Sequence, residues 1–126
     1  MKPSGLQLEL RDSVYEPGAT GGKILYDRSL PNHPRYKVWL YLDGQDLPYV
    51  KSVTYTLHAT FPDPVRSVPR TPSNPYCALA IWTWGLFDVL AEVEDKTGGR
   101  HMLKHMMRYD QDLKPDARYE QVEVGR

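Results

Sequence analysis

Short runs in which apolar and polar residues alternate constrain the fold of this chain more than any other feature of its sequence. The clearest run is Tyr-Lys-Val-Trp-Leu-Tyr-Leu at 36–42. A period of two places alternate side chains on opposite faces of a strand, so this segment is predicted to be a half-buried strand. Similar runs recur along the chain, separated by glycine and proline turn signals about every 8 to 12 residues. The sequence therefore predicts an all-β protein.

We expect seven or eight short antiparallel strands in an immunoglobulin-like β-sandwich. The strand at 49–59 is interrupted near its start and is a candidate partner for 36–42. The proline-rich segment 62–75 is predicted to be extended and to cross between the sheets without pairing. Residues 111–126 form a polar tail or a marginal edge strand. The other expected strands lie at 6–11, 24–26, 76–82, 87–94 and 101–109.

Composition limits the class of protein. The chain has 126 residues, which fits a single domain over 1–126. Its 16 basic and 16 acidic residues balance, so we expect no direct binding of nucleic acid and no membrane surface as partner. We expect no signal peptide and no membrane span. One cysteine, Cys77, excludes an internal disulfide and favours a reducing compartment, the cytoplasm or, in a eukaryote, the nucleus.

Two motifs lie about twenty residues apart, each where a strand pattern gives way to a loop. They are Leu-His-Ala-Thr-Phe at 57–61 and Thr-Trp-Gly-Leu-Phe at 83–87. Loops of a sandwich cluster at its two ends, so the motifs meet if both turns lie at the same end. Together they offer two large aromatic rings, a hydroxyl, an imidazole and a glycine. This set suits a small recognition slot better than a catalytic centre.

With these motifs, residues 36–109 resemble a YEATS domain. The family's first motif, Leu-His-x-Ser/Thr-Phe/Tyr, is matched in full, and its second is matched except that Thr83 stands where glycine is usual. The segment before about residue 33 is unlike the eukaryotic members, which favours the prokaryotic branch. The resemblance implies an immunoglobulin-like sandwich that reads acetylated or crotonylated lysine on a protein or peptide, without enzymatic activity and without a cofactor.

The resemblance also implies a role for each residue of the two motifs. Phe61 and Trp84 would be the aromatic walls, Thr60 would hydrogen-bond the acyl amide, and His58 would brace the slot. A backbone N–H near Trp84 or Gly85 would hold the acyl carbonyl. Thr83 adds a Cβ at the position of the family's glycine. If the register of this strand were shifted, Trp82 would be the wall in place of Trp84.

Each signal also has a purely structural interpretation. Phe61 and Trp84 are large enough to belong to the core, and we assign Phe87 to the core. His58 could be a satisfied structural histidine, and Thr60 could cap the turn before Pro62. Arg66, Arg70 and Arg100 could hold an acidic partner or nucleic acid, but because the net charge is zero we interpret them as scattered surface charges.

Other functions remain as alternatives. The main alternative is a YEATS-like interaction domain that binds a partner without acyl-lysine dependence. A small hydrolase built on Cys77 and His58 is the weakest, and we expect no enzyme. His101 and His105 have metal-ligand spacing for a helix, but we place them on a strand and expect no metal site. The bound protein, the preferred acyl group, the pathway and the oligomeric state stay open.

Overall fold

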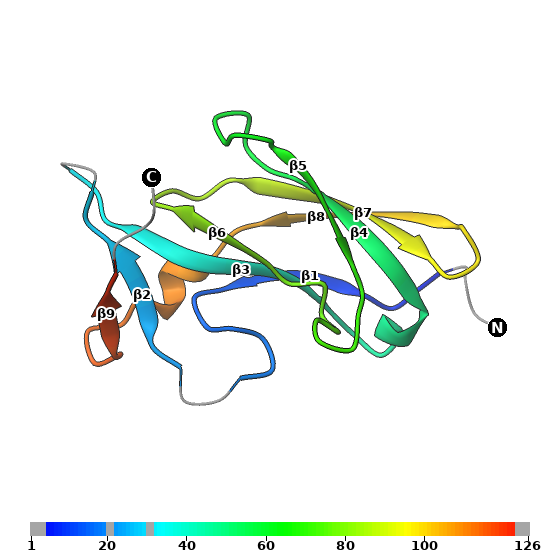
Figure 1. Ribbon diagram of the computed structural model, residues 1–126, viewed down its shortest axis with the longest axis horizontal. Coiled ribbons are helices and arrows are strands. Elements are labelled where there is room, and N and C mark those ends of the chain that lie inside the picture. The colour runs from blue at the N-terminus through cyan, green and yellow to red at the C-terminus, as the bar shows by residue number, and fades with distance from the viewer. Residues whose placement is uncertain (1–4, 20–21, 30–31, 123–126) are drawn as a thin grey trace.

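Two packed β-sheets form the molecule. The structure, a computed structural model, describes residues 5–19, 22–29 and 32–122. Within these ranges the chain forms nine strands and two short 3-10 turns, and the strands lie in two layers (Figure 1). The predicted immunoglobulin-like β-sandwich is therefore confirmed, with one strand more than expected. No helix in the described ranges has the length and apolar character needed to cross a membrane.

The first sheet is organised around the long strand β3 (Arg35–Asp43). β6 (Leu79–Thr83) pairs along one edge of β3, and β1 (Glu9–Ser13) and β2 (Ile24–Asp27) pair along successive parts of the other. These pairs are antiparallel. β9 (Tyr119–Gln121) pairs with β2 in parallel, so the polar C-terminal segment supplies the marginal edge strand that was one of its two predicted states.

The second sheet is antiparallel throughout. Its order is β5 (Val65–Pro69), β4 (Val50–Thr56), β7 (Asp88–Asp95) and β8 (Arg100–Met106). β4 contains an irregularity between Val50 and Ser52, where the sequence predicted an interruption. The hairpin between β7 and β8 turns through Gly98, whose φ is +89°. The predicted strand at 101–109 ends at Met106 and gives way to a 3-10 turn over Tyr109–Asp112.

The core lies between the two sheets and follows the alternation in the sequence. On β3, Val38, Leu40 and Leu42 are fully buried, while the intervening side chains remain partly exposed. β4 and β7 contribute their own alternate residues to the same cluster. Tyr55 is fully buried and donates a hydrogen bond from its hydroxyl to the carbonyl oxygen of Cys77, 2.7 Å away. A satisfied phenol lets a large aromatic residue occupy the core without an unpaired polar group.

Two strand predictions were wrong. β3 and β4 do not pair, because the connection between them carries the chain from one sheet to the other through a 3-10 turn over Leu47–Tyr49. The segment 62–75 does pair, since Val65–Pro69 forms β5 along the edge of the second sheet. Prolines stand only near the ends of β5, and an edge strand tolerates prolines that a central strand would not.

β6 also begins later than predicted. The expected strand started at residue 76, but the regular strand begins at Leu79. Cys77 has a positive φ of 51°, a conformation that breaks the extended backbone before the strand. The Asn74 side chain holds this bend, donating to the carbonyl oxygen of Ala78 and accepting from its N–H.

Candidate functional site

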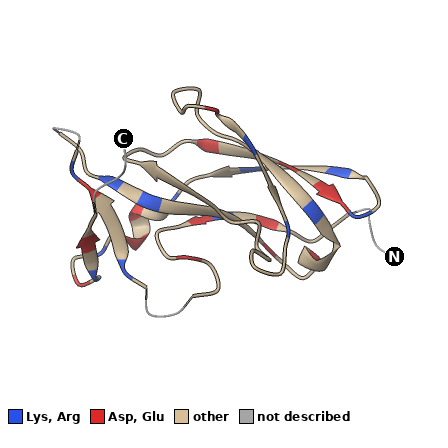
Figure 2. Cartoon of the chain, in the orientation of Figure 1, with Lys and Arg blue, Asp and Glu red and all other residues tan. Residues whose placement is uncertain are grey.

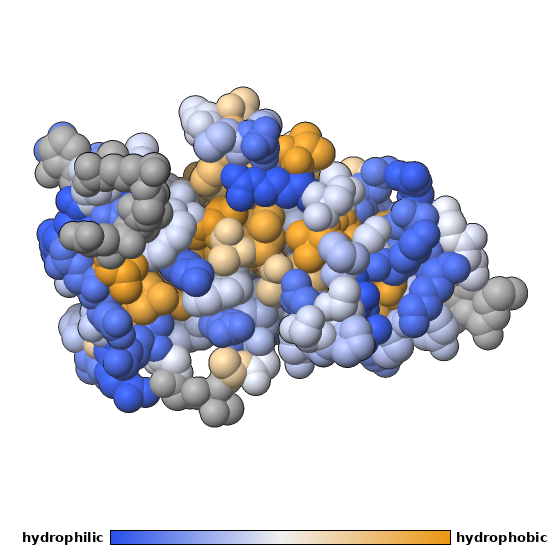
Figure 3. All heavy atoms as spheres, viewed as in Figure 1, coloured by the Kyte–Doolittle hydropathy of each residue, from blue (hydrophilic) through white to orange (hydrophobic). Residues whose placement is uncertain are grey.

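A cavity of about 890 Å³, which we call the slot, is lined mainly by β6 and by the loops that follow β4 and β6. All six residues predicted for the ligand site line it: His58, Thr60, Phe61, Thr83, Trp84 and Gly85. Residues that were not predicted for the site line it too, among them Arg35, Arg66 and Phe87, and so does Trp82, the alternative wall. Figure 3 shows apolar surface gathered over β6 in the middle of this face, with hydrophilic side chains beside it. The fold thus brings the two separated motifs together.

The first motif is a turn that directs an imidazole toward a hydroxyl. The N–H of Phe61 donates to the carbonyl oxygen of His58 at 3.0 Å and closes the turn. His58 Nδ1 accepts the N–H of Thr60 at 3.3 Å and lies 2.8 Å from Thr60 Oγ1. Because a backbone N–H can only donate, we assign Nδ1 as the acceptor and the ring proton to Nε2. The Thr60 hydroxyl then donates to Nδ1, and its oxygen keeps lone pairs for a further donor.

Three rings pack together behind this turn. Phe61 and Phe87 have centroids 5.4 Å apart with planes inclined by 54°, and His58 meets Phe87 edge-on at 6.0 Å. Phe87 was predicted to be core. It packs against the core but is only partly buried, and it also lines the slot. Phe87 therefore supports the rings of Phe61 and His58 from the core side.

The second motif is held by the hydroxyl of Thr83. Thr83 is buried, and its Oγ1 accepts the N–H of Gly85 and donates to the carbonyl oxygen of Gly85, each at 3.2 Å. The Tyr109 hydroxyl also donates to that carbonyl at 3.2 Å. Thr83 does not have a positive φ, so the position does not need glycine for its backbone angle. Of the two backbone N–H groups predicted to hold an acyl carbonyl, that of Gly85 is already bonded to Thr83.

Trp84 stands at the mouth of the slot with 57 % of its surface exposed, which rules out the core interpretation. The imidazole of His33, from the loop before β3, stacks on the indole with centroids 4.6 Å apart and an interplanar angle of 12°. Trp82 is partly buried on β6 and lines the slot as well, so the fold leaves both tryptophans beside it. Sequence reasoning missed His33, because no local pattern links the β2–β3 loop to a turn fifty residues later.

Two arginines supply the fixed charges of the slot. Arg35 forms an ion pair with Asp27, and its buried Nε has no hydrogen-bond partner among the residues that the structure describes. Burial alone would raise the pKa of Asp27, but hydrogen bonds from Arg35 and Ser29 bring that pKa below its ordinary value. Arg66 donates from Nε to the carbonyl oxygen of Asp63 at 3.0 Å and from Nη2 to that of Pro62 at 2.9 Å. Arg66 is thus tied to the slot-forming turn and is not a scattered surface charge.

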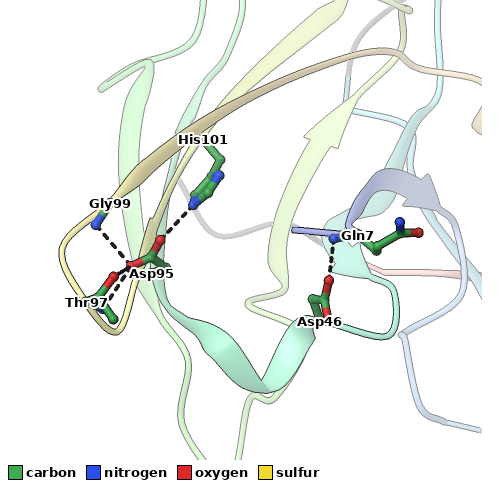
Figure 4. A network of polar contacts seen from close by, with 6 residues as sticks. All are labelled: Gln7, Asp46, Asp95, Thr97, Gly99 and His101. Carbon is green, nitrogen blue, oxygen red and sulfur yellow. Dashed lines mark hydrogen bonds and ion pairs between the residues drawn. The ribbon is translucent and has the colours of Figure 1, made fainter. Parts of the chain in front are cut away.

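The two histidines with metal-ligand spacing serve separate structural contacts. Both lie on β8, as predicted, but His101 Nε2 meets Asp95 at 2.7 Å (Figure 4), while His105 Nε2 meets Asp12 at 2.6 Å. The described residues contain no cluster of three or more metal-ligating side chains. Figure 4 also shows Asp46 accepting the N–H of Gln7, which fixes the turn after β3.

Cys77 does not have the environment of a nucleophile. It is fully buried, and burial raises the pKa of its thiol to about 11, so it carries little thiolate at neutral pH. It is absent from the residues lining the slot, whereas His58 is present. The structure therefore gives no support to a Cys77–His58 hydrolase.

Comparison with known proteins identifies the family. The sequence model of the prokaryotic YEATS domain matches residues 35–108, a range that contains both motifs. This chain belongs to that family. The matched range agrees within one residue with the resemblance drawn from the motifs, so the YEATS assignment no longer rests on the motifs alone. No curated protein sequence matches the chain significantly.

Solved YEATS domains have the same fold. The Yaf9 YEATS domain recognising an H3K122suc peptide has a TM-score of 0.55 and 20 % identity, covering 84 % of this chain and 78 % of its own. Yaf9, the yeast AF-9 homolog, has a TM-score of 0.51 and 24 % identity, covering 80 % and 68 %. The Yaf9 YEATS domain bound to H3K27ac has a TM-score of 0.51 and 23 % identity, covering 80 % and 73 %.

Proposed function

We propose that this YEATS domain is a non-enzymatic binding module that recognises acylated lysine on a partner protein. One observation carries the proposal: six residues from two separated motifs line a single cavity, and the His58–Thr60 hydrogen bond within it leaves a hydroxyl oxygen able to accept. The Yaf9 structures point the same way, since those domains are bound to acylated histone peptides.

The slot offers an acylated lysine a partner for each part of its amide. The aromatic rings of Phe61 and Trp84 would contact the flat amide, and each such contact is worth about 0.5–1.5 kcal/mol beyond burial. Thr60 Oγ1 would accept the amide N–H. The N–H of Trp84 would donate to the acyl carbonyl, because Thr83 already occupies the N–H of Gly85. An amide placed in this way has both polar groups satisfied.

The same arrangement disfavours unmodified lysine. Acylation removes the positive charge of the ammonium group and leaves a planar amide. An ammonium would bring three donors into a slot whose charged lining residues, within the described part of the chain, are Arg35 and Arg66. The free lysine would therefore lose hydration without gaining an anionic partner, and we expect it to bind much more weakly.

The deciding experiment is a titration of the full chain with matched lysine peptides that are unmodified, acetylated or crotonylated. Calorimetry reports binding without depending on tryptophan. We expect acyl-dependent binding with a Kd in the micromolar range or weaker, because a single side chain buries little area.

Two variants test the aromatic walls. Trp84→Ala and Phe61→Ala should each weaken acyl-peptide binding by roughly tenfold or more. Leu90→Ala, on the outer face of the second sheet, is the matched control. Equal affinity for all three peptides would refute acyl recognition.

A second candidate is an interaction domain that binds a partner without acyl-lysine dependence. The observation in its favour is the outer face of the second sheet, where four apolar side chains lie exposed. They are Val65, Leu90, Met102 and Met106. Met102 and Met106 project from β8, the edge strand of that sheet, and flexible methionines suit adaptable contacts. Met102→Glu with Met106→Glu would abolish partner binding under this alternative and would leave acyl-peptide binding unchanged under the first.

A further inference from the structure

The charged side chains in the described lining of the slot have one sign. Among the fourteen described residues that line it, Arg35 and Arg66 are charged and none is an aspartate or glutamate. The whole chain has 16 basic and 16 acidic residues, so the imbalance is local and not a reflection of composition. Figure 2 shows basic residues on the first half of β3, beside β6, and on β5. The described lining of the slot is therefore mostly aromatic and apolar with two cationic side chains, and the neighbouring carboxylates of Asp63 and Asp88 are not part of it.

Arg66 is the charge that a ligand can use. Its Nε and Nη2 are held by two backbone carbonyl groups, and Nη1 has no hydrogen-bond partner in the described part of the chain. No carboxylate in the described part of the chain lies within ion-pair distance of Arg66. Asp63, three residues earlier, contributes its backbone carbonyl and not its side chain. The guanidinium is therefore held in place with a free edge and with no ion-pair partner among the described residues.

Lys37 extends the cationic surface along the sheet. It lies opposite Trp82 in the register of β3 and β6, and directly opposed residues of an antiparallel pair project to the same face. Trp82 lines the slot, so Lys37 lies beside a lining residue without lining the slot itself. Its Nζ sits 5.1 Å from the centroid of the Trp39 ring and has no carboxylate partner within the described residues. Arg35 adds less, because Asp27 neutralises it.

We infer that the acyl-lysine read by this slot lies in an acidic stretch of its partner, with aspartate or glutamate side chains close to it in the sequence. The inference rests on the proposed function and adds the chemistry of the partner. A basic peptide would bring like charges toward Arg66 and Lys37, which opposes binding. An acidic peptide would place carboxylates beside them. Nη1 of Arg66 is positioned to donate to one such carboxylate.

The test uses four peptides of equal length in which only charge and acylation vary. Three carry a central crotonyllysine flanked by glutamates, by glutamines or by lysines, and the fourth is the glutamate peptide with unmodified lysine. The acyl group is neutral in every case, so a charge effect can come only from the flanks. We expect the glutamate peptide to bind about three- to tenfold more tightly than the glutamine peptide, the range that one or two exposed ion pairs provide. The lysine peptide should bind most weakly of the acylated three.

Salt and a matched pair of variants identify the groups responsible. Raising NaCl from about 50 mM to about 500 mM should bring the glutamate and glutamine affinities together, because exposed charges are screened. Arg66→Gln should bring the glutamate-to-glutamine ratio close to one. Arg100→Gln removes the same charge at the far hairpin, where Arg100 pairs with Glu92, and should leave the ratio unchanged.

The outcomes separate the two proposals. Acyl-dependent binding with equal affinity for glutamate, glutamine and lysine flanks would overturn the acidic partner and leave the acyl reader standing. An unchanged ratio in Arg66→Gln would also overturn it. Equal binding of the modified and unmodified glutamate peptides would overturn the acyl reader, with any preference for acidic flanks then a property of the surface alone.

Discussion

The imidazole of His33 lies flat on the indole of Trp84, with ring centroids 4.6 Å apart and planes inclined by 12°. His33 lies in the loop that leads into β3 and Trp84 in the turn that follows β6, so this contact joins the β2–β3 loop to the slot. One face of the indole is thereby covered and the ring is held in one orientation. A wall that is oriented before binding loses less freedom when a ligand arrives.

His33→Ala should therefore disturb Trp84 without unfolding the protein. We expect a change in tryptophan emission and acyl-peptide affinity about two- to tenfold weaker, the value of one stacking contact. His33→Phe, which keeps a flat ring, should retain most of the affinity. Circular dichroism and calorimetry check fold and binding together. Unchanged emission and affinity in His33→Ala would mean that the stack does not position the wall.

Thr83 should be a structural residue of the slot turn. Its hydroxyl bonds both the N–H and the carbonyl of Gly85, so Thr83→Ala removes two contacts from a buried position. We expect the free energy of unfolding to fall by about 1–3 kcal/mol. Thr83→Ser keeps the hydroxyl and should lose less than Thr83→Ala. Urea unfolding measures both variants, and equal losses in the two would show that the methyl group, not the hydroxyl, matters.

Substitution by alanine should affect the stability of the protein little at Gly85 and strongly at Gly44. A Cβ at Gly85 would meet nothing within 4 Å, and its φ is not positive, so Gly85→Ala should change the unfolding free energy by no more than about 0.5 kcal/mol. A Cβ at Gly44 would clash with the backbone carbonyl oxygen of Gln7, at a φ of +128°. Gly44→Ala should therefore be destabilising by at least about 2 kcal/mol. Similar stabilities for the two variants in urea would contradict this contrast.

Local patterns were sufficient for much of the fold. The alternation at 36–42 identified β3 and its buried face, because side chains of a strand must alternate and the apolar set must face the core. The two motifs supplied six residues of one cavity, since both occur where strands end at the same end of the sandwich. Periodicity and loop position were enough for these predictions because each depends on a short stretch of chain.

Features that depend on distant contacts were missed. β4 was offered as a partner for β3 because the two are neighbours in sequence, but the 3-10 turn at Leu47–Tyr49 sends β4 to the other sheet. β5 was missed because prolines hide an edge strand that tolerates them. The contacts of His33 with Trp84 and of Arg66 with the turn carbonyls depend on where loops meet in space. No spacing in the sequence encodes those meetings.

Asp12 should be among the most important polar residues for stability. It is buried on β1, and its carboxylate accepts from His105 Nε2 at 2.6 Å and from the N–H groups of Arg108 and Tyr109 at 2.8 Å each. Asp12→Ala leaves these donors without their acceptor, and we expect a loss of about 2–4 kcal/mol. Glu120→Ala, which removes an exposed pair with Lys23, should lose no more than about 0.5 kcal/mol. Comparable losses of stability for Asp12→Ala and Glu120→Ala in urea unfolding would refute this role of Asp12.

Tyr109 connects Asp12 to the slot. Its N–H donates to Asp12, and its hydroxyl donates to the carbonyl oxygen of Gly85. Tyr109→Phe removes that single partly buried bond and should lose about 0.5–1.5 kcal/mol of stability, less than Asp12→Ala. Acyl-peptide binding should weaken only slightly, since Thr83 still holds the turn. Calorimetry on the variant checks the affinity, and a loss as large as that of Trp84→Ala would instead assign Tyr109 a direct part in the site.

Asp95 should make the stability of the protein depend on acid pH. It is 1 % exposed, and hydrogen bonds from the Thr97 side chain, from His101 and from the N–H groups of Thr97 and Gly99 hold its pKa well below the ordinary value. A carboxyl whose pKa is depressed by folding stabilises the protein above its unfolded pKa, and loses that contribution as the pH falls toward the folded value. The unfolding free energy of the parent should therefore decline as the pH is lowered below about 4.

Asp95→Asn provides the comparison that isolates this group. It cannot ionise, so it should be less stable than the parent near neutral pH, and the difference should narrow as the pH falls below about 4. Urea unfolding of both proteins at about pH 6, 4 and 3 measures the two trends. Asp88→Asn, an exposed residue whose carboxylate lies 3.8 Å from Lys104, controls for the loss of one negative charge and should follow the parent. A constant difference between parent and Asp95→Asn across the three pH values would mean that other carboxyl groups govern the acid sensitivity.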